Sequence, residues 1–214
     1  RQREAYERES LERRAEKRGK AHAEDCDWNS GQRRDGGEGG GAFECVAVTG
    51  TKGKSTTTVL LGRMLEAGGR SALIGGNVGT ALSTQVEHST PDAIHVVEVS
   101  SFQLELTTTF RPWISVFLNL HADHLDRHDR PEAYAAAKAR IFANQGPSDT
   151  LVVNADDPDV LSLTRGSRAS RVAYAVTAPL EDGVVVDGDV IVRRTPNGAE
   201  PLVPLSAVHL LGDH

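Results

Sequence analysis

VAVTGTKGKSTTT, residues 46–58, is the stretch that decides the fold of this 214-residue chain. A short apolar run leads into a glycine turn, a Lys-Ser-Thr triplet follows, and an amphipathic segment continues to residue 65. Strand, glycine loop and helix N-terminus together form a phosphate cradle, because glycines let backbone N–H groups turn inward, a lysine adds positive charge and a hydroxyl can ligate Mg²⁺. The stretch therefore predicts a nucleoside triphosphate site in an α/β domain.

The spacing of this loop departs from the general P-loop pattern, which has four residues between its first glycine and Gly-Lys-Ser/Thr. Only Thr51 and Lys52 separate Gly50 from Gly53, and Val48 stands where the first glycine is expected. A glycine-capped helix start with a solvated lysine is the alternative interpretation. The strand and helix that flank the loop favour the phosphate site.

The composition argues against nucleic-acid-binding, membrane-spanning and disulfide-rich classes of protein. Lys and Arg number 24 against 30 Asp and Glu, which argues against nucleic acid as the main partner. We expect no membrane span, because no run of about 18 apolar residues is present. The two cysteines, Cys26 and Cys45, make no disulfide framework, and this fits a reducing, cytoplasmic location.

The chain divides into two parts. Residues 1–42 are rich in Arg, Glu, Gly and Asp and poor in aliphatic side chains, so we expect an atypical, disordered tail. A tail that contacts a partner is the alternative. Residues 43–214 alternate between strand-like and helix-like segments and form the folded domain.

The alternation predicts an α/β fold with a mostly parallel sheet flanked by helices on both faces. Short apolar runs predict strands at 45–49, 72–74, 94–99, 114–118, 150–154 and 171–175. Helices are expected at 54–67, 79–85, 102–106, 131–144 and 158–164. Near the end, 183–194 predicts a β-hairpin that turns at Asp187-Gly188.

Polar side chains gather where the predicted strands end, which is where ligands bind in such sheets. Glu98 sits inside an otherwise apolar predicted strand, and a buried carboxylate is costly unless it is paired or bound to a metal. A buried ion pair is one interpretation. A Mg²⁺ ligand is the favoured one, because Ser55 or Thr56 offers a hydroxyl to the same ion.

The loop after the fourth strand resembles a metal cluster in composition, with His121, Asp123, His124, Asp126 and His128. A zinc site is not expected, because no cysteine pair accompanies these residues. A polar loop with helix-capping acids is the interpretation for His121 and His128.

Together these pieces resemble the ATP-dependent Mur ligases of peptidoglycan synthesis. GTKGKST (50–56) is similar to that family's shortened phosphate loop, and GGNVG (75–79) to the loop after its second strand. DHLD (123–126), AAKARIF (136–142) and NADD (154–157) are also similar to family segments. EVSSFQLE (98–105) is the most specific piece and favours the member that adds D-glutamate.

The resemblance implies a P-loop-type Mur ligase central domain and a role for each matching residue. Lys54, His124 and Lys138 are the implied catalytic residues. The implied nucleotide contacts are Gly50, Thr51, Lys52, Gly53, Lys54, Ser55, Thr56 and Asn77. The implied Mg²⁺ ligands are Ser55, Glu98, His124 and Lys138, with Lys138 carbamylated. Without the resemblance, Lys138 is interpreted as a solvated helix lysine.

The resemblance also implies a reaction: ATP and Mg²⁺ drive addition of D-glutamate to UDP-N-acetylmuramoyl-L-alanine through an acyl phosphate. A monomer is expected. The resemblance spans about 45–214 and corresponds to the central domain of a three-domain enzyme, without its N-terminal UDP-binding and C-terminal domains. The alternatives are another Mur or folylpolyglutamate-type ligase, and an ATP-binding fragment without turnover.

Overall fold

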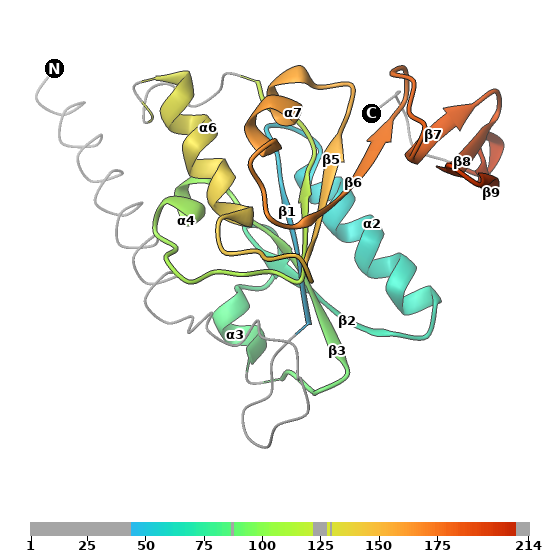
Figure 1. Cartoon of the computed structure of the whole chain (residues 1–214). Helices are drawn as coiled ribbons and strands as arrows, with labels where there is room; N and C mark the ends of the chain where they lie inside the picture. Colours follow the sequence, from blue (N-terminus) through green and yellow to red (C-terminus); the bar gives the residue numbers. More distant parts are fainter. Residues whose placement is uncertain (1–43, 87, 122–127, 129, 209–214) are drawn as a thin grey trace, which may run out of the picture.

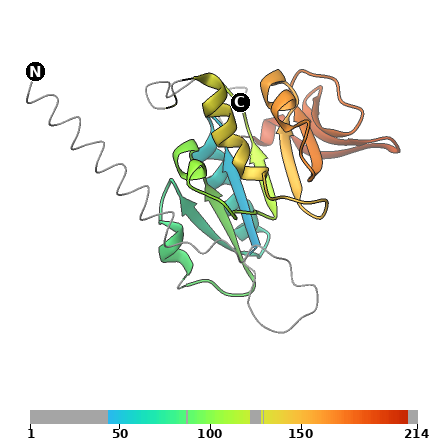
Figure 2. The same cartoon turned by 60° about the vertical axis from the view of Figure 1, so that its left-hand side comes forward.

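The computed structural model describes residues 44–86, 88–121, 128 and 130–208, which form one nine-stranded sheet with helices on both faces (Figures 1 and 2). The strand order is β2-β3-β1-β4-β5-β6-β7-β8-β9, and the pairs from β2 to β7 are parallel. The mostly parallel α/β fold predicted from the sequence is therefore confirmed.

The bounds of the elements follow the predicted segments closely. The strands are β1 Glu44–Thr49, β2 Ser71–Gly76, β3 Ala93–Glu98, β4 Ile114–Phe117, β5 Thr150–Asn154, β6 Ser170–Ala175, β7 Gly183–Asp187, β8 Val190–Thr195 and β9 Gly198–Pro204. The helices are α2 Lys54–Ala67, α3 Leu82–Val86, α4 Ser101–Glu105, α6 Pro131–Ala139 and α7 Pro158–Thr164, with 3₁₀ turns η2 Arg140–Phe142 and η3 Leu205–Ala207. None of these described helices is long and apolar enough to cross a membrane.

Three elements differ from the prediction. The helix expected from residue 79 begins at Leu82, because Gly79 has φ 71°, a left-handed conformation that a helix excludes. The helix expected to reach residue 144 ends at Ala139 and tightens into η2. Strand β9 was not predicted because it contains Pro201 and Pro204, which a sheet tolerates at its edge.

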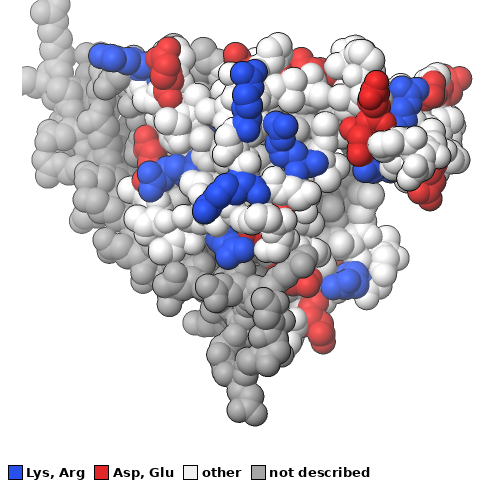
Figure 3. Space-filling view, viewed as in Figure 1, with Lys and Arg blue, Asp and Glu red and all other residues white. Residues whose placement is uncertain are grey.

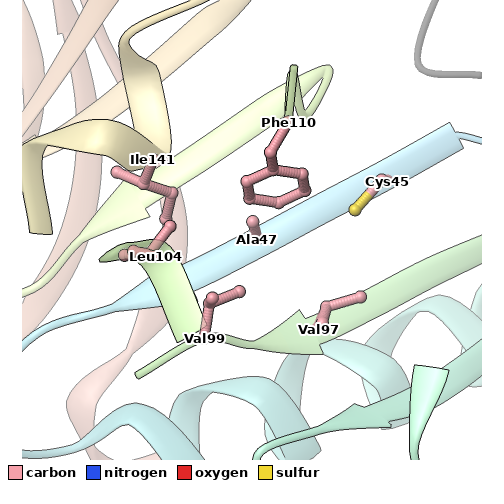
Figure 4. Close-up of a cluster of buried hydrophobic side chains, with 7 residues drawn as sticks. All are labelled: Cys45, Ala47, Val97, Val99, Leu104, Phe110 and Ile141. Atoms are coloured by element: carbon pink, nitrogen blue, oxygen red, sulfur yellow. The ribbon is translucent and has the colours of Figure 1, made fainter. Parts of the chain in front are cut away.

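The core explains why the central strands are apolar throughout. Alternate side chains of a strand point to opposite faces, and both faces of this sheet are covered. On one face, α4 and η2 pack on a cluster that Figure 4 shows: Cys45, Ala47, Val97, Val99, Leu104, Phe110 and Ile141. On the other face, Leu61 and Leu65 of α2 pack on Val46, Val48, Ile94, Val96 and Val116. Burial raises the pKa of the Cys45 thiol to about 12, which makes it an inert core side chain.

Strands β7, β8 and β9 form an antiparallel extension that projects beyond the parallel part of the sheet (Figure 1). The predicted hairpin is confirmed: β7 and β8 pair from Gly183↔Arg194 to Asp187↔Val190, and Gly188 takes φ 57° in the turn. Acidic and basic side chains lie side by side on this part (Figure 3). Arg193 pairs with Asp182 at 2.6 Å and Arg194 with Asp187 at 2.7 Å, and such exposed pairs contribute about 0–1 kcal/mol each.

The sheet order brings three strand ends together at the candidate site. β1 lies between β3 and β4, with Val48 opposite both Glu98 and Val116. The loops that follow β1, β3 and β4 therefore leave the same edge of the sheet next to one another. In parallel α/β sheets this carboxyl edge is where ligands bind.

Candidate functional site

The loop between β1 and α2 runs close against the chain that follows β4. A Cβ added to Gly50 would lie 3.0 Å from Leu118 Cβ and 3.3 Å from Asn119 N, tighter than ordinary Cβ contacts, so glycine suits this close approach. Gly53 is the N-cap of α2 with φ 80° and ψ −5°, a left-handed conformation that favours glycine.

The N-terminus of α2 has the form of an anion site. The first N–H groups of a helix have no intrahelical acceptor, and Gly53 has no side chain to cap them. The first turn also contains no acidic residue. These N–H groups and the positive end of the helix dipole can therefore bind a phosphate.

Two lysines converge on this loop. Lys54 Nζ donates to the carbonyl oxygens of Gly50 and Thr51, each at 3.1 Å. Lys138 Nζ donates to the same Gly50 oxygen at 2.7 Å. Lys138 is only 2% exposed, so the interpretation as a solvated helix lysine is wrong. Both side-chain nitrogens therefore lie against the carbonyl oxygens of this loop.

Tyr134 is a residue of this site that the sequence reasoning missed. Its ring centroid lies 4.7 Å from Lys138 Nζ, which is a cation–π distance. Its hydroxyl lies 3.3 Å from Thr51 Oγ1, and the side chain is 2% exposed. The i,i+4 spacing of Tyr134 and Lys138 on α6 is the signal that could have indicated the contact.

Glu98 ends β3 as a buried carboxylate held by neutral donors. Ser55 Oγ donates to its Oε2 at 2.7 Å, and Asn77 Nδ2 donates to its Oε1 at 2.8 Å. Glu98 is 2% exposed, and these bonds come from a hydroxyl and an amide rather than from a lysine or arginine. A carboxylate and a hydroxyl in contact are hard oxygen ligands of the kind that Mg²⁺ prefers, so the residues fit this ion.

The glycine loop after β2 allows this arrangement. A Cβ on Gly76 would lie 2.3 Å from the Glu98 carbonyl oxygen, and Gly76 has φ 101°. The backbone N–H of Asn77 then donates to that oxygen at 2.9 Å. Asn77 is thus fixed beside Glu98 by both its backbone and its side chain.

The remaining predicted phosphate-loop residues lie around this centre. Lys52 is exposed, and Thr56 is exposed on the first turn of α2. His121 is exposed, in keeping with a polar loop, and its backbone contacts the Thr51 hydroxyl. His124, with Asp123 and Asp126, lies outside the described residues. Within the described ranges no group of three or more His, Cys, Asp or Glu side chains could hold a metal ion.

His128 is the one histidine for which the polar-loop interpretation is wrong. It is 3% exposed, and its Nε2 lies 3.0 Å from Ser101 Oγ while its Nδ1 lies 3.1 Å from Glu105 Oε1. Its ring stacks on Phe102, with centroids 5.5 Å apart. His128 therefore packs on α4 as a structural contact.

The SSFQ segment caps and anchors α4. Ser100 Oγ accepts from Gln103 N at 3.3 Å, and Ser100 N donates to Gln103 Oε1 at 2.9 Å, which together form a capping box. The next serine, Ser101, contacts His128 as described above. In the described residues this segment thus has a clear structural role.

The NADD segment also links strand ends. Asp157 Oδ2 accepts from Leu120 N at 2.8 Å, while its Oδ1 caps α7 through Asp159 N and Val160 N. Burial alone would raise the pKa of Asp156, but hydrogen bonds from Thr177, Val176 and Ala178 outweigh it and lower that pKa below its ordinary value. Both carboxylates are therefore committed to holding the fold.

Sequence comparison identifies a family for most of this chain. Residues 48–200 match the family described as the Mur ligase middle domain. The chain is 47% identical over 169 residues to UDP-N-acetylmuramoylalanine--D-glutamate ligase from Pelotomaculum thermopropionicum, covering 79% of this chain and 37% of the relative. It is 44% identical over 172 residues to the enzyme of the same name from Shouchella clausii, covering 80% and 37%.

Solved structures share the fold at lower identity. A UDP-N-acetylmuramoyl-L-alanyl-D-glutamate--2,6-diaminopimelate ligase superposes with a TM-score of 0.59 at 23% identity, covering 75% of this chain and 39% of that one. The MurF ligase from Thermotoga maritima in complex with ADP gives a TM-score of 0.54 at 18% identity, covering 75% and 40%. The chain spans 37% of the length of the curated relatives reported above.

Proposed function

The chain belongs to the Mur ligase family, whose middle domain its residues 48–200 match, and we propose that it binds ATP for formation of an amide bond. The proposed reaction adds D-glutamate to UDP-N-acetylmuramoyl-L-alanine. The observation that carries the proposal is the uncapped N-terminus of α2, with Lys54 and Lys138 converging on its loop and the Glu98–Ser55 pair beside it.

Lys54 and the first N–H groups of α2 bind the ATP phosphates in this proposal. A lysine that now donates to two loop carbonyls can exchange them for phosphate oxygens without moving far. Preorganised donors of this kind stabilise charge that develops during phosphoryl transfer, because they need little reorganisation. No side-chain nucleophile is required.

Ser55 and Glu98 would hold one Mg²⁺, and a bound Mg²⁺ supplies positive charge that offsets the charge on the phosphoryl oxygens. The resemblance assigns a second ion to His124 and to a carbamylated Lys138. The buried position of Lys138 at the loop supports a role for this side chain at the phosphates. The second ion and the carbamate stay predictions.

The proposed reaction has two steps. A carboxylate oxygen of the alanyl substrate forms a bond to the γ-phosphorus, and the bond from phosphorus to the ADP oxygen breaks. The D-glutamate amine then forms a bond to the acyl carbon, loses a proton, and phosphate leaves. The chain's own residues bind and orient the phosphoryl group during the first step.

D-Glutamate is proposed because the curated relatives carry that substrate in their names and the SSFQ segment is present here. The substrates of the whole enzyme are part of the proposal, since the chain spans 37% of those relatives. The second candidate is nucleotide binding without turnover, which the uncapped N-terminus of α2 and Lys54 would support equally. The monomeric state and the cytoplasmic location stay predictions.

A chimera tests the proposed reaction. Residues 44–208 replace the matching segment of the Pelotomaculum thermopropionicum ligase, and ADP release is measured with UDP-N-acetylmuramoyl-L-alanine and either D-glutamate or another amino acid. We expect ADP release that depends on D-glutamate and is lost in the Lys54→Ala chimera. Release that does not depend on D-glutamate in a folded, ATP-binding chimera would contradict the substrate assignment.

A further inference from the structure

Asn119 makes hydrogen bonds to the phosphate loop through both the oxygen and the nitrogen of its side-chain amide. Its Oδ1 accepts from the backbone N–H groups of Thr51 at 2.9 Å and Lys52 at 2.8 Å. Its Nδ2 donates to the Lys52 carbonyl oxygen at 3.1 Å. Its backbone carbonyl also accepts from Thr51 N at 3.1 Å. One residue thus makes hydrogen bonds to three consecutive peptide groups of the loop.

The side chain of Thr51 makes a second attachment to the same segment. Thr51 Oγ1 accepts from His121 N at 3.0 Å and donates to His121 O at 3.1 Å. Thr51 is 9% exposed, so this contact is largely removed from water. The chain after β4 therefore holds the loop at two neighbouring points, residues 119 and 121.

Because of these bonds, some backbone groups of the loop hold the fold and others stay available for a ligand. The N–H groups of Thr51 and Lys52 are used on Asn119, so they are not directed at a ligand. The carbonyl oxygens of Gly50 and Thr51 are directed at the two lysines instead. The N–H groups that remain for a phosphate begin at Gly53 and continue into the first turn of α2.

We propose that Asn119 is a positioning residue of the nucleotide site. Its amide binds the N–H groups of Thr51 and Lys52, so these two groups hold the fold. The Gly50 and Thr51 carbonyl oxygens then face the two lysines, Lys54 and Lys138. A phosphate would be bound by the N–H groups from Gly53 onward. The inference rests on the proposed nucleotide binding. It adds that the shortened loop needs this amide to hold its shape.

An amide suits this position better than a carboxylate or an aliphatic side chain. A carboxylate would face the Lys52 carbonyl with a second acceptor where Nδ2 now donates. An aliphatic side chain would leave the Thr51 and Lys52 N–H groups without their side-chain acceptor. The carboxylate would repel the Lys52 carbonyl, and the aliphatic side chain would free the two peptide groups to rotate, so either change should weaken ligand binding.

NMR on the wild-type chain, with MgADP as the probe, tests directly which loop N–H groups bind Asn119 and which bind phosphate. We expect the amides of Gly53, Lys54, Ser55 and Thr56 to shift on titration. We expect the amides of Thr51 and Lys52 to exchange slowly with D₂O both before and after MgADP is added. Fast exchange of both amides in the free chain would overturn the proposal without reference to any variant.

Asn119→Ala tests the consequence for affinity. We expect MgADP to bind about tenfold more weakly, equivalent to ~1.4 kcal/mol, and the Thr51 and Lys52 amides to lose protection. Asn144→Ala is the matched control, because Asn144 Nδ2 also donates to backbone carbonyls, of Thr108 at 2.9 Å and Phe110 at 3.1 Å, away from the loop. The control should lose stability and keep wild-type affinity.

The outcomes separate the inference from the proposed function. Wild-type MgADP binding that is unchanged in Asn119→Ala would overturn the positioning role alone. A wild-type chain that binds neither MgADP nor MgATP would overturn the proposed function and the inference with it. Equal loss of affinity in Asn119→Ala and Asn144→Ala would assign the effect to general destabilisation and also overturn the positioning role.

Discussion

Replacing Glu98 by glutamine separates a metal ligand from a structural carboxylate. The change removes one negative charge and keeps the shape of the side chain. In the structure the two carboxylate oxygens accept from Ser55 Oγ at 2.7 Å and from Asn77 Nδ2 at 2.8 Å. The introduced amide would keep one acceptor for Asn77, and its NH₂ group would donate to the Ser55 hydroxyl, which rotates to accept.

The expected change in the free energy of unfolding is therefore small, within about 1 kcal/mol, because both hydrogen bonds survive and burial of a charge is relieved. The loss of a charged ligand acts on Mg²⁺ instead. A bond to a charged group is worth roughly 1.5–3 kcal/mol, so the Mg²⁺ concentration that half-supports ADP binding should rise about 10- to 150-fold.

The assay is a series of ADP titrations by calorimetry at increasing Mg²⁺ concentration. Asp149→Asn is the matched control, because Asp149 is also a buried carboxylate, 3% exposed, but it pairs with Arg111 at 2.8 Å just before β5. This control should unfold more easily, by about 1–3 kcal/mol, and keep the wild-type Mg²⁺ requirement. An unchanged Mg²⁺ requirement in Glu98→Gln would refute the ligand assignment.

Two further predictions concern buried basic side chains. Burial lowers the pKa of His95 below 6.5, so the folded state favours the neutral ring. The free energy of unfolding therefore keeps its full value above pH 6.5 and falls as the pH drops toward the lowered pKa. Urea unfolding at pH 8 and pH 5.5 should show this loss, and a loss of equal size in His95→Gln would contradict it. In the active chimera, Lys138→Ala should reduce turnover strongly, and short carboxylic acids should restore part of it by replacing the carbamate. Full activity of that variant in CO₂-depleted buffer would exclude the carbamate.

The strands and the site's location could be predicted because each depends on local pattern. Apolar runs such as 45–49 must be covered on both faces, and Gly50 and Gly53 mark a tight turn before a helix. The parallel order then places the ends of β1, β3 and β4 together. Glu98 was recognisable as a ligand candidate because a carboxylate in an apolar strand needs a specific partner.

Other contacts between distant segments could not be predicted. Asn119 lies 67 residues from Lys52, and nothing in its neighbours indicates that its amide holds the loop. The burial of His128 depends on Ser101, 27 residues earlier, and on the stacking of Phe102. Lys138 can be buried because its Nζ contacts the Tyr134 ring and donates to the Gly50 carbonyl oxygen. Composition alone does not reveal these contacts.

The most direct test of the central claim is a calorimetric titration of the chain with MgADP, in the wild type and in Lys54→Ala. The claim predicts saturable 1:1 binding that weakens about 10- to 150-fold in the variant, since a charged donor is lost, with little change in stability. Arg63→Ala, an exposed cation on the same helix, should bind as the wild type does. Equal affinity in the wild type and Lys54→Ala, or no binding by the wild type, would contradict the claim.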